Sequence, residues 1–228
     1  MIAFGFDFDH TLGTDHGLER KALYAYAQEL GHPLDPDDAT WHARLDTLLA
    51  EFREGALTAD AMVHRFAAVL DVPGADVDRW RAHCYALVDE FVVPLDGAPE
   101  LLASLRARNV PVAILTNGWT PLQQKKIARA LGEDGRTLPI LVSDEIRAVK
   151  PAKAAFDALV DALGVPRADV WYVGDNARGD AGGALAAGLR AVWVDRDGEP
   201  YPPELPPPTR TVRSLRELES LTENTIAP

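Results

Sequence analysis

The sequence opens on Ile2-Ala3-Phe4-Gly5-Phe6, which runs directly into Asp7-Phe8-Asp9-His10-Thr11. The first five residues form a short apolar run, which is typical of a strand buried on both faces. The next five place two carboxylates and a hydroxyl at the point where this strand ends. Because ligands of open parallel sheets bind at the carboxyl ends of strands, the stretch predicts the first strand of an α/β fold with a polar site at its end.

Four amphipathic segments follow this strand. In the first, from about residue 18, Leu23, Tyr26 and Leu30 recur at helical spacing before Gly31 ends the run. Further helices are expected over residues 38–54, after an N-cap at Thr58, and over residues 76–91. Four consecutive helices of this kind predict a small four-helix bundle, which we assign to residues 15–94.

After Pro94, strands and helices alternate. A helix is expected near residues 98–108 and strands at residues 110–115, 140–142, 170–173 and 191–194. Thr120-Pro121 predicts a further helix that begins with proline and is capped by Thr120. The proline-rich residues 199–208 predict an extended connector, and residues 209–228 a short strand, a helix and a tail. The alternation predicts a parallel sheet covered on both faces, built from residues 1–14 and 95–228.

Composition and charge narrow the possible partners. The 228 residues carry a net charge of −12, which argues against a nucleic-acid polymer or a membrane surface as partner, because both require positive potential. Residues 15–94 alone hold 15 acidic and 7 basic groups. A single cysteine, Cys84, excludes an intramolecular disulfide. With no signal peptide or long apolar run expected, we predict a cytoplasmic protein.

Polar residues also follow the later strands. Thr116-Asn117-Gly118 comes after one strand, Gly174-Asp175 and, a few residues on, Asp180 after another, and Lys150 stands between a strand and a helix. Four carboxylates with a hydroxyl and an ammonium at strand ends indicate a hard cation beside an anion, and Mg²⁺ prefers such oxygen ligands. The six histidines show no metal-ligand spacing, so no zinc site is expected.

In this order, these stretches resemble the four motifs of the haloacid dehalogenase (HAD) superfamily of hydrolases. The motifs are D-F-D-H-T-L at residues 7–12, I-L-T-N-G at 114–118, V-K-P at 149–151 and V-G-D-N-A-R-G-D at 173–180. The resemblance covers essentially the whole chain and implies a Rossmann-like core with an inserted α-helical cap at residues 15–94. One departure is Gly179, where the family often has Asn, and it bears on the geometry around Asp180.

The resemblance also implies roles for single residues. Asp7 is expected to be the nucleophile that attacks phosphorus, and Asp9 the general acid and then the general base. The phosphoryl oxygens are expected to be bound by Thr116, Asn117 and Lys150. Mg²⁺ is expected to be held by the Asp7 carboxylate, the main-chain carbonyl of Asp9, Asp175, and Asp180 either directly or through water.

The acidic Asp9 favours phosphate esters as substrates, because family members that cleave C–halogen or C–P bonds typically lack an acid there. Phosphonatases also use a cap lysine, and Lys21, the only lysine of residues 15–94, is expected to be solvated. We therefore predict a Mg²⁺-dependent phosphomonoester hydrolase that acts on a small phosphorylated metabolite, either a nucleoside monophosphate or a sugar phosphate. A phosphomutase and a non-catalytic phosphate-binding regulatory module are the alternatives, and a monomer and a homodimer stay open.

Two residues near the expected site are candidates for substrate contact. Residues 116–132 are similar to the branch of the family that contains pyrimidine nucleotidases and sialic-acid phosphatases. Trp119 in this stretch could stack on a base or sugar ring, or anchor its loop. His10 could meet the substrate, or belong to a solvated loop.

Overall fold

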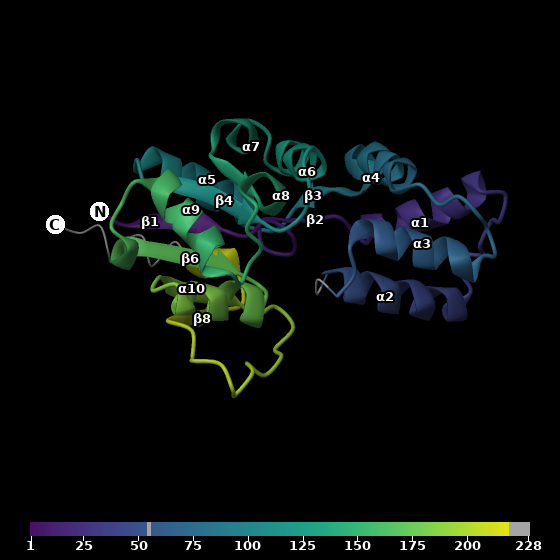
Figure 1. Cartoon of the computed structure of the whole chain (residues 1–228). Coiled ribbons are helices and arrows are strands. Elements are labelled where there is room, and N and C mark those ends of the chain that lie inside the picture. Colours follow the sequence, from purple (N-terminus) through teal and green to yellow (C-terminus); the bar gives the residue numbers. More distant parts are fainter. Residues whose placement is uncertain (54–55, 219–228) are drawn as a thin grey trace. The chain divides into compact units, whose positions relative to one another are not determined.

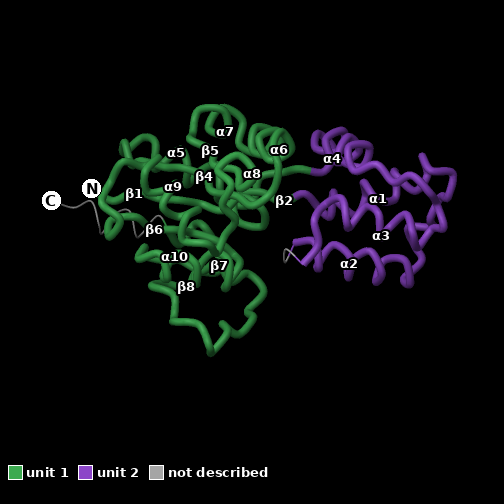
Figure 2. Tube along the Cα trace, viewed as in Figure 1, with its two compact units in different colours: residues 1–14, 92–228 green, residues 15–91 purple. Residues whose placement is uncertain are grey.

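A computed structural model describes residues 1–53 and 56–218 of the chain. It divides the chain into two compact units (Figure 2), one of residues 1–14 and 92–228 and the other of residues 15–91. The first strand is thus separated in sequence from the rest of its unit by the whole of the second. That the second unit acts as a cap remains a prediction.

The first unit contains a parallel sheet (Figure 1). Among the described residues this sheet has six strands, in the order β5-β4-β1-β6-β7-β8. Their bounds are β1 (Ala3–Phe6), β4 (Val112–Thr116), β5 (Ile140–Val142), β6 (Val170–Gly174), β7 (Arg190–Val194) and β8 (Arg210–Val212). In the register, Phe6 lies opposite Ile114 of β4 and Val173 of β6. The predicted α/β fold with a parallel sheet is confirmed, and the opening strand lies inside the sheet with the two motif-bearing strands on either side.

Both faces of β1 are buried, which explains its unbroken apolar sequence. Phe4 and Phe6 point to one face, where their rings stack with centroids 6.0 Å apart. On the other face lies helix α9 (Lys153–Leu163). There Gly5 allows close approach, because a Cβ atom at this position would come within 2.5 Å of the Leu159 side chain.

Shorter elements complete the first unit. They are α5 (Ala98–Ala107), α6 (Leu122–Leu131), α7 (Asp134–Thr137), α8 (Ser143–Ile146), α10 (Gly183–Ala186), the 3₁₀ turns η1 (Arg167–Asp169) and η3 (Leu215–Leu218), and the π-helical turn η2 (Ala177–Gly182). The strands β2 (Gly13–Thr14) and β3 (Val93–Pro94) pair antiparallel. Residues 92–94, which the sequence analysis assigned to the insertion, thus belong to the first unit.

The predicted cap of α6 is wrong. The helix begins at Leu122, and Thr120 makes no capping hydrogen bond. The Thr120 N–H and hydroxyl instead donate to the carboxylate of Asp144, at 2.9 and 3.4 Å. The polar groups of Thr120, which the local sequence assigned to the helix end, therefore bind a carboxylate from another part of the chain. The predicted connector at residues 199–208 is irregular as expected, and residues 219–228 lie outside the described residues.

In the part of the second unit that the structure describes there are four helices, as their periodicity predicted: α1 (Leu18–Glu29), α2 (Ala39–Arg53), α3 (Ala59–Val69) and α4 (Val77–Phe91). Thr58 caps α3, since its hydroxyl accepts a hydrogen bond from the Ala61 N–H at 3.1 Å. The buried side chains of this unit include Tyr26, Phe66, Trp80 and Cys84. Over residues 1–53 and 56–218, none of the helices has the length and apolar character that crossing a bilayer requires.

Candidate active site

The candidate site lies where β1, β4 and β6 end, and its centre is Asp7, the first residue after β1. Its buried carboxylate accepts from the Lys150 ammonium at 2.6 Å. The same ammonium donates to Asp180 at 2.7 Å and to the Tyr172 hydroxyl at 2.9 Å. The site thus brings together three segments of the chain that carried separate motifs. Tyr172 was missed by the sequence analysis, because it sits within an apolar strand where a buried aromatic residue is expected.

Lys150 is held through its main chain by Asn117, which follows β4. The Asn117 side-chain oxygen accepts from the Lys150 N–H at 2.9 Å, and its amide donates to the Lys150 carbonyl at 3.1 Å. This side chain therefore positions Lys150. A contact of Asn117 with phosphoryl oxygens stays a prediction, as it does for Thr116, whose buried hydroxyl donates to the Asn117 carbonyl at 3.3 Å.

Asp175, directly after β6, is joined to the first motif by Thr11. The Thr11 hydroxyl lies 3.2 Å from the Asp175 carboxylate, and it accepts from the Asp175 N–H at 3.1 Å. Its distance to Asp7 Oδ2 is 3.5 Å. Arg196 donates to the Thr11 carbonyl at 3.0 Å, from the loop after β7. The hydroxyl thus links two candidate metal ligands and orders the loop that follows β1.

Asp180 lies on the turn η2, almost fully buried. Its carboxylate accepts from Lys150 on one oxygen and from the Asn176 N–H, at 3.0 Å, on the other. A Cβ atom at Gly174 would lie 2.3 Å from this carboxylate, so only glycine leaves room for it. Gly179, where the family often has Asn, belongs to the same turn. Its N–H donates to the Asn176 side chain at 2.8 Å, and the contacts of Asp180 are formed with glycine at this position.

Burial and mutual repulsion control the charges of these groups. Burial raises the pKa of Asp7 to about 7 although the Lys150 ammonium opposes this. Burial and the nearby Asp7 raise the pKa of Asp175 to about 6, and burial raises the pKa of Asp180. For Lys150, burial would lower the pKa, but Asp180 and Asp7 outweigh it and raise the pKa well above its usual value. Three carboxylates thus lie around one ammonium, which contacts two of them, Asp7 and Asp180.

This donor set fits a divalent cation. Asp7, Asp175 and Asp180 each offer a carboxylate oxygen, and these oxygens lie within 4.8 Å of one another. Oxygen ligands with excess negative charge are what Mg²⁺ and similar hard cations require. The raised pKa values of Asp7 and Asp175 also favour a bound cation, because its positive charge would stabilise their ionised forms.

Asp9 contacts two side chains of α6 that the sequence analysis missed. Gln123 donates to Asp9 Oδ2 at 2.8 Å, and the Lys126 ammonium lies 2.5 Å from Asp9 Oδ1. Both side chains are buried. Their signal in the sequence was present, because they share one helical stripe with the apolar Ile127 and Ala130, where a glutamine and a lysine require a polar partner.

The two candidate substrate contacts are His10 and Trp119. His10 is exposed in the loop after Asp9, with φ of 60°, and its N–H donates to the Gly13 carbonyl at 2.7 Å. Trp119 is partly buried at the start of α6, where its carbonyl accepts from the Gln123 N–H at 3.1 Å. Their contact with substrate remains a prediction. In the second unit, the Lys21 ammonium lies 4.4 Å from the centroid of the Phe91 ring, a packing contact.

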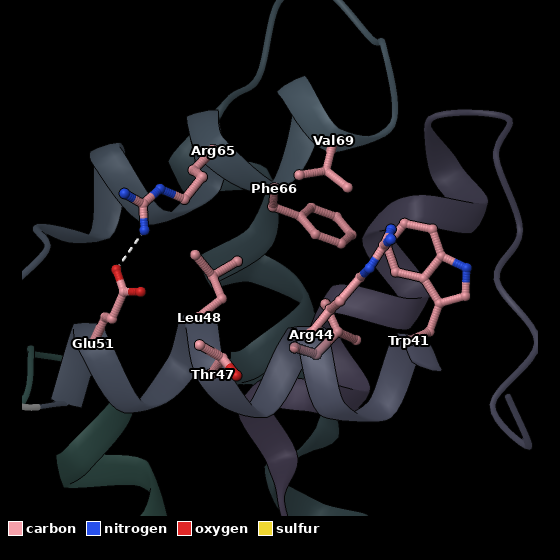
Figure 3. A pocket seen from close by; sticks show the side chains of 9 residues that line it. Trp41, Arg44, Thr47, Leu48, Glu51, Arg65, Phe66 and Val69 are labelled. Carbon is pink, nitrogen blue, oxygen red and sulfur yellow. Dashed lines mark hydrogen bonds and ion pairs between the residues drawn. The ribbon is translucent and has the colours of Figure 1, made fainter. Parts of the chain in front are cut away.

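A separate groove of about 460 Å³ lies in the second unit, between α2 and α3 (Figure 3). Its floor is apolar, and the Arg65 guanidinium forms an ion pair with Glu51 at its edge. The residues that line it are Trp41, Arg44, Leu45, Thr47, Leu48, Glu51, Arg65, Phe66 and Val69. None of the predicted site residues is among them, so the candidate chemistry belongs to the strand ends.

Comparisons with known proteins identify the family of this chain. The sequence profile of haloacid dehalogenase-like hydrolases matches residues 2–188. The pyrimidine 5'-nucleotidase YjjG of Escherichia coli (strain K12) is 33% identical over 224 residues, which are 95% of each chain. The phosphoserine phosphatase of Thermus thermophilus is 36% identical over 201 residues, 86% of this chain and 77% of that protein.

A solved structure has a similar fold over nearly the full length. The magnesium-bound HAD-hydrolase YfnB from Bacillus subtilis superposes with a TM-score of 0.77 at 27% identity, and the match covers 96% of this chain and 97% of that one. The profile match spans most of the chain, and the residues that carried the resemblance meet at one edge of the sheet. The chain therefore belongs to the haloacid dehalogenase-like hydrolases, and it is a hydrolase of the phosphatase type.

Proposed function

We propose that this hydrolase is a Mg²⁺-dependent phosphomonoesterase that acts on a small phosphorylated metabolite through an aspartyl-phosphate at Asp7. The observation that carries the proposal is the position of Asp7. Its carboxylate follows the central strand, contacts the only ammonium of the three-carboxylate cluster among the described residues, and lies beside Asp175 and Asp180. A nucleophile, a fixed cation and a set of metal ligands are thereby within reach of one phosphoryl group.

The reaction follows from two carboxylates with different surroundings. Asp7 attacks phosphorus, the bond from phosphorus to the ester oxygen breaks, and Asp9 gives its proton to that leaving oxygen. Asp9 then takes a proton from water, the water oxygen attacks the phosphorus, and the bond from phosphorus to Asp7 breaks to release phosphate. Asp9 suits this double role because its side chain is about one-third exposed, at 30%, whereas that of Asp7 is 9% exposed.

The metal would be held by Asp7, Asp175, the Asp9 carbonyl, and Asp180 directly or through water. When bound, Mg²⁺ supplies positive charge for the oxygens of the transferred group. Lys150 supplies a second, permanent charge, since its ammonium is fixed by two carboxylates and by the Tyr172 hydroxyl. Asn117 binds the main chain of Lys150 at both its N–H and its carbonyl, which anchors the residue that carries this charge.

For the substrate we propose a nucleoside monophosphate or a sugar phosphate. The similarity to a protein named pyrimidine 5'-nucleotidase along 95% of both chains supports the first class. The partly exposed Trp119, at the end of the phosphate-binding loop, supports either class, because an indole can stack on a base or pack against a sugar. A panel of phosphorylated metabolites would rank them by kcat/KM.

The first test is hydrolysis of p-nitrophenyl phosphate by the purified chain. With Mg²⁺ we expect nitrophenol and inorganic phosphate in equal amounts, and EDTA should abolish both. Asp7→Asn should lower kcat by about 10³-fold or more, because the nucleophile is lost. Asp161→Asn is the matched control, since this aspartate is exposed on α9 and should keep wild-type activity.

Three outcomes would contradict the proposal. Near-normal turnover by Asp7→Asn would exclude the aspartyl-phosphate route, and full activity in EDTA would exclude the metal. Release of nitrophenol without matching inorganic phosphate would show transfer to another acceptor, as in a phosphomutase.

A further inference from the structure

We propose that Gln123 and Lys126 of α6 are positioning residues, which hold the Asp9 carboxylate where it can protonate the leaving oxygen. This inference rests on the proposed function and extends it to two residues that lie outside the four motifs. It concerns how Asp9 is oriented, and it leaves the role of Asp7 as it stands.

The geometry around Asp9 is that of a clamped carboxylate. Gln123 Nε2 lies 2.8 Å from one oxygen, and Lys126 Nζ lies 2.5 Å from the other. The hydrogen bond from Gln123 on Oδ2 and the ion pair with Lys126 on Oδ1 together orient the carboxylate, and Oδ1 accepts no hydrogen bond from the described residues. The donors are almost inaccessible, with 3% exposure for Gln123 and 4% for Lys126, whereas the Asp9 side chain keeps 30%. Asp9 can thus meet a substrate while the groups that orient it stay covered.

Gln123 also ties Asp9 to the phosphate-binding loop. The same Nε2 lies 2.8 Å from the Thr116 hydroxyl and 2.8 Å from the Asn117 carbonyl. Its other amide atom, Oε1, is buried and accepts no hydrogen bond from residues 1–53 and 56–218. The orientation of this amide is therefore set on its donor side, where its two N–H bonds face three oxygens. One side chain connects the loop after β1 with the loop after β4.

Lys126 adds a buried positive charge, which requires a partner. A buried ammonium loses hydration that only an ion pair or hydrogen bonds can replace. Asp9 provides that partner, and the Phe8 ring, with its centroid 5.9 Å from the ammonium, covers the same side chain. Lys126 and Gln123 are three residues apart and so lie on one face of the helix. Helix α6 thereby presents one hydrogen-bond donor and one cation to a single carboxylate.

A buried ion pair could serve stability alone, so the test must separate positioning from packing. Protonation of the leaving oxygen matters greatly for an alkyl phosphate, whose alkoxide is a poor leaving group. It matters little for p-nitrophenyl phosphate, whose phenolate leaves unaided. The ratio of kcat/KM for glycerol phosphate to kcat/KM for p-nitrophenyl phosphate therefore reports on the proton from Asp9. Since both values come from one preparation, a partly unfolded variant lowers them equally and leaves the ratio unchanged.

The variants are Lys126→Met and Gln123→Met, which keep an unbranched side chain of similar length and remove the donor. We expect each to lower kcat/KM for glycerol phosphate by about 10- to 100-fold and for p-nitrophenyl phosphate by less than about 3-fold, a share of what general acids contribute. The neighbours on α6 provide matched controls. Lys125→Met and Gln124→Met should leave the ratio at its wild-type value. Lys126→Arg, which keeps the cation, should hold the ratio to within about 3-fold.

Equal losses on both substrates, or no loss on either, in the Lys126→Met and Gln123→Met variants would overturn the proposal and leave these residues as packing elements. A ratio that rises in Lys126→Met would also overturn it, because the ion pair would then restrain Asp9. Failure of the proposed function looks different. In that case the wild-type chain would hydrolyse neither ester, or Asp7→Asn would remain active on both.

Discussion

At the scale of residues, the site concentrates negative charge. Asp7, Asp175 and Asp180 have carboxylate oxygens within 4.8 Å of one another, and Lys150 contacts only two of them, Asp7 and Asp180. Burial raises the pKa of Asp7 to about 7 and that of Asp175 to about 6. In the metal-free chain these groups therefore hold protons at a pH at which an exposed aspartate has lost them.

Metal binding should consequently depend on pH. A cation must displace the protons on Asp7 and Asp175, so its affinity rises as pH rises through these pKa values of about 6 and about 7. We expect the apparent Kd for Mg²⁺ to fall at least about tenfold between pH 5.5 and pH 7.5. Isothermal titration calorimetry measures both the Kd and the protons released. A pH-independent Kd without proton release would contradict the assignment of these carboxylates as ligands, and Asp161→Asn should behave as the wild type.

At the scale of elements, the site depends on how closely the strand ends and turns approach each other. Residues of β6 and the turn η2 meet at Gly174, where a Cβ atom would lie 2.3 Å from the Asp180 carboxylate. Asp180 in turn fixes Lys150 at 2.7 Å. A π-helical turn such as η2 is uncommon and is frequently found at functional sites. Here it returns the chain so that Asp180 reaches the ammonium.

A methyl group at this close approach should damage the site. Gly174→Ala should displace Asp180 and with it Lys150, because the added methyl group cannot share the space of the carboxylate. We expect a loss of about 1 to 3 kcal/mol in the free energy of unfolding and a fall of about tenfold or more in kcat/KM, since small displacements of positioned groups are costly. Chemical denaturation and p-nitrophenyl phosphate hydrolysis measure the two effects.

Gly179→Ala serves as the control for that variant. A Cβ atom there meets the side chain of the exposed Asn176 at 3.3 Å, which needs to give by only a few tenths of an ångström. This variant should keep its activity to within about threefold and its stability to within about 1 kcal/mol. If Gly174→Ala were as mild as this control, the contact between β6 and η2 would not matter for the site.

At the scale of the whole molecule, charge is unevenly distributed. The chain carries −12, and residues 15–94 alone hold 15 acidic against 7 basic groups. Such a chain repels extended polyanions, and this repulsion weakens as salt shortens the Debye length. A small phosphate should be less affected, because in the proposed mechanism Lys150 and a bound metal would meet it locally.

This difference in charge should separate short substrates from long ones. We expect a nucleoside 5'-monophosphate to be a better substrate than a ten-nucleotide single strand with a 5'-phosphate, by about tenfold or more in kcat/KM at low salt. Between 20 and 300 mM NaCl, kcat/KM for the strand should rise about threefold or more, while that for p-nitrophenyl phosphate should change less. An oligonucleotide rate that falls with salt would indicate a positively charged binding surface and contradict the expectation.

The fold class and most of the site could be predicted from the amino-acid sequence. Strand β1 was predictable because a strand buried on both faces needs apolar residues throughout, and the four helices of the second unit because each shows one apolar face. The charged site residues were predictable because parallel strands end at one edge of the sheet. They are Asp7, Lys150, Asp175 and Asp180. Their joint motif pattern then identified the family.

Only the tertiary structure shows which polar side chains of the site contact one another. There the Asn117 side chain binds the main chain of Lys150, the polar groups of Thr120 bind Asp144, and Gln123 and Lys126 bind Asp9. Most of these contacts join residues far apart in the chain, and local periodicity carries no information about such partners. A buried polar group must find a partner, but which partner it finds depends on how the chain packs.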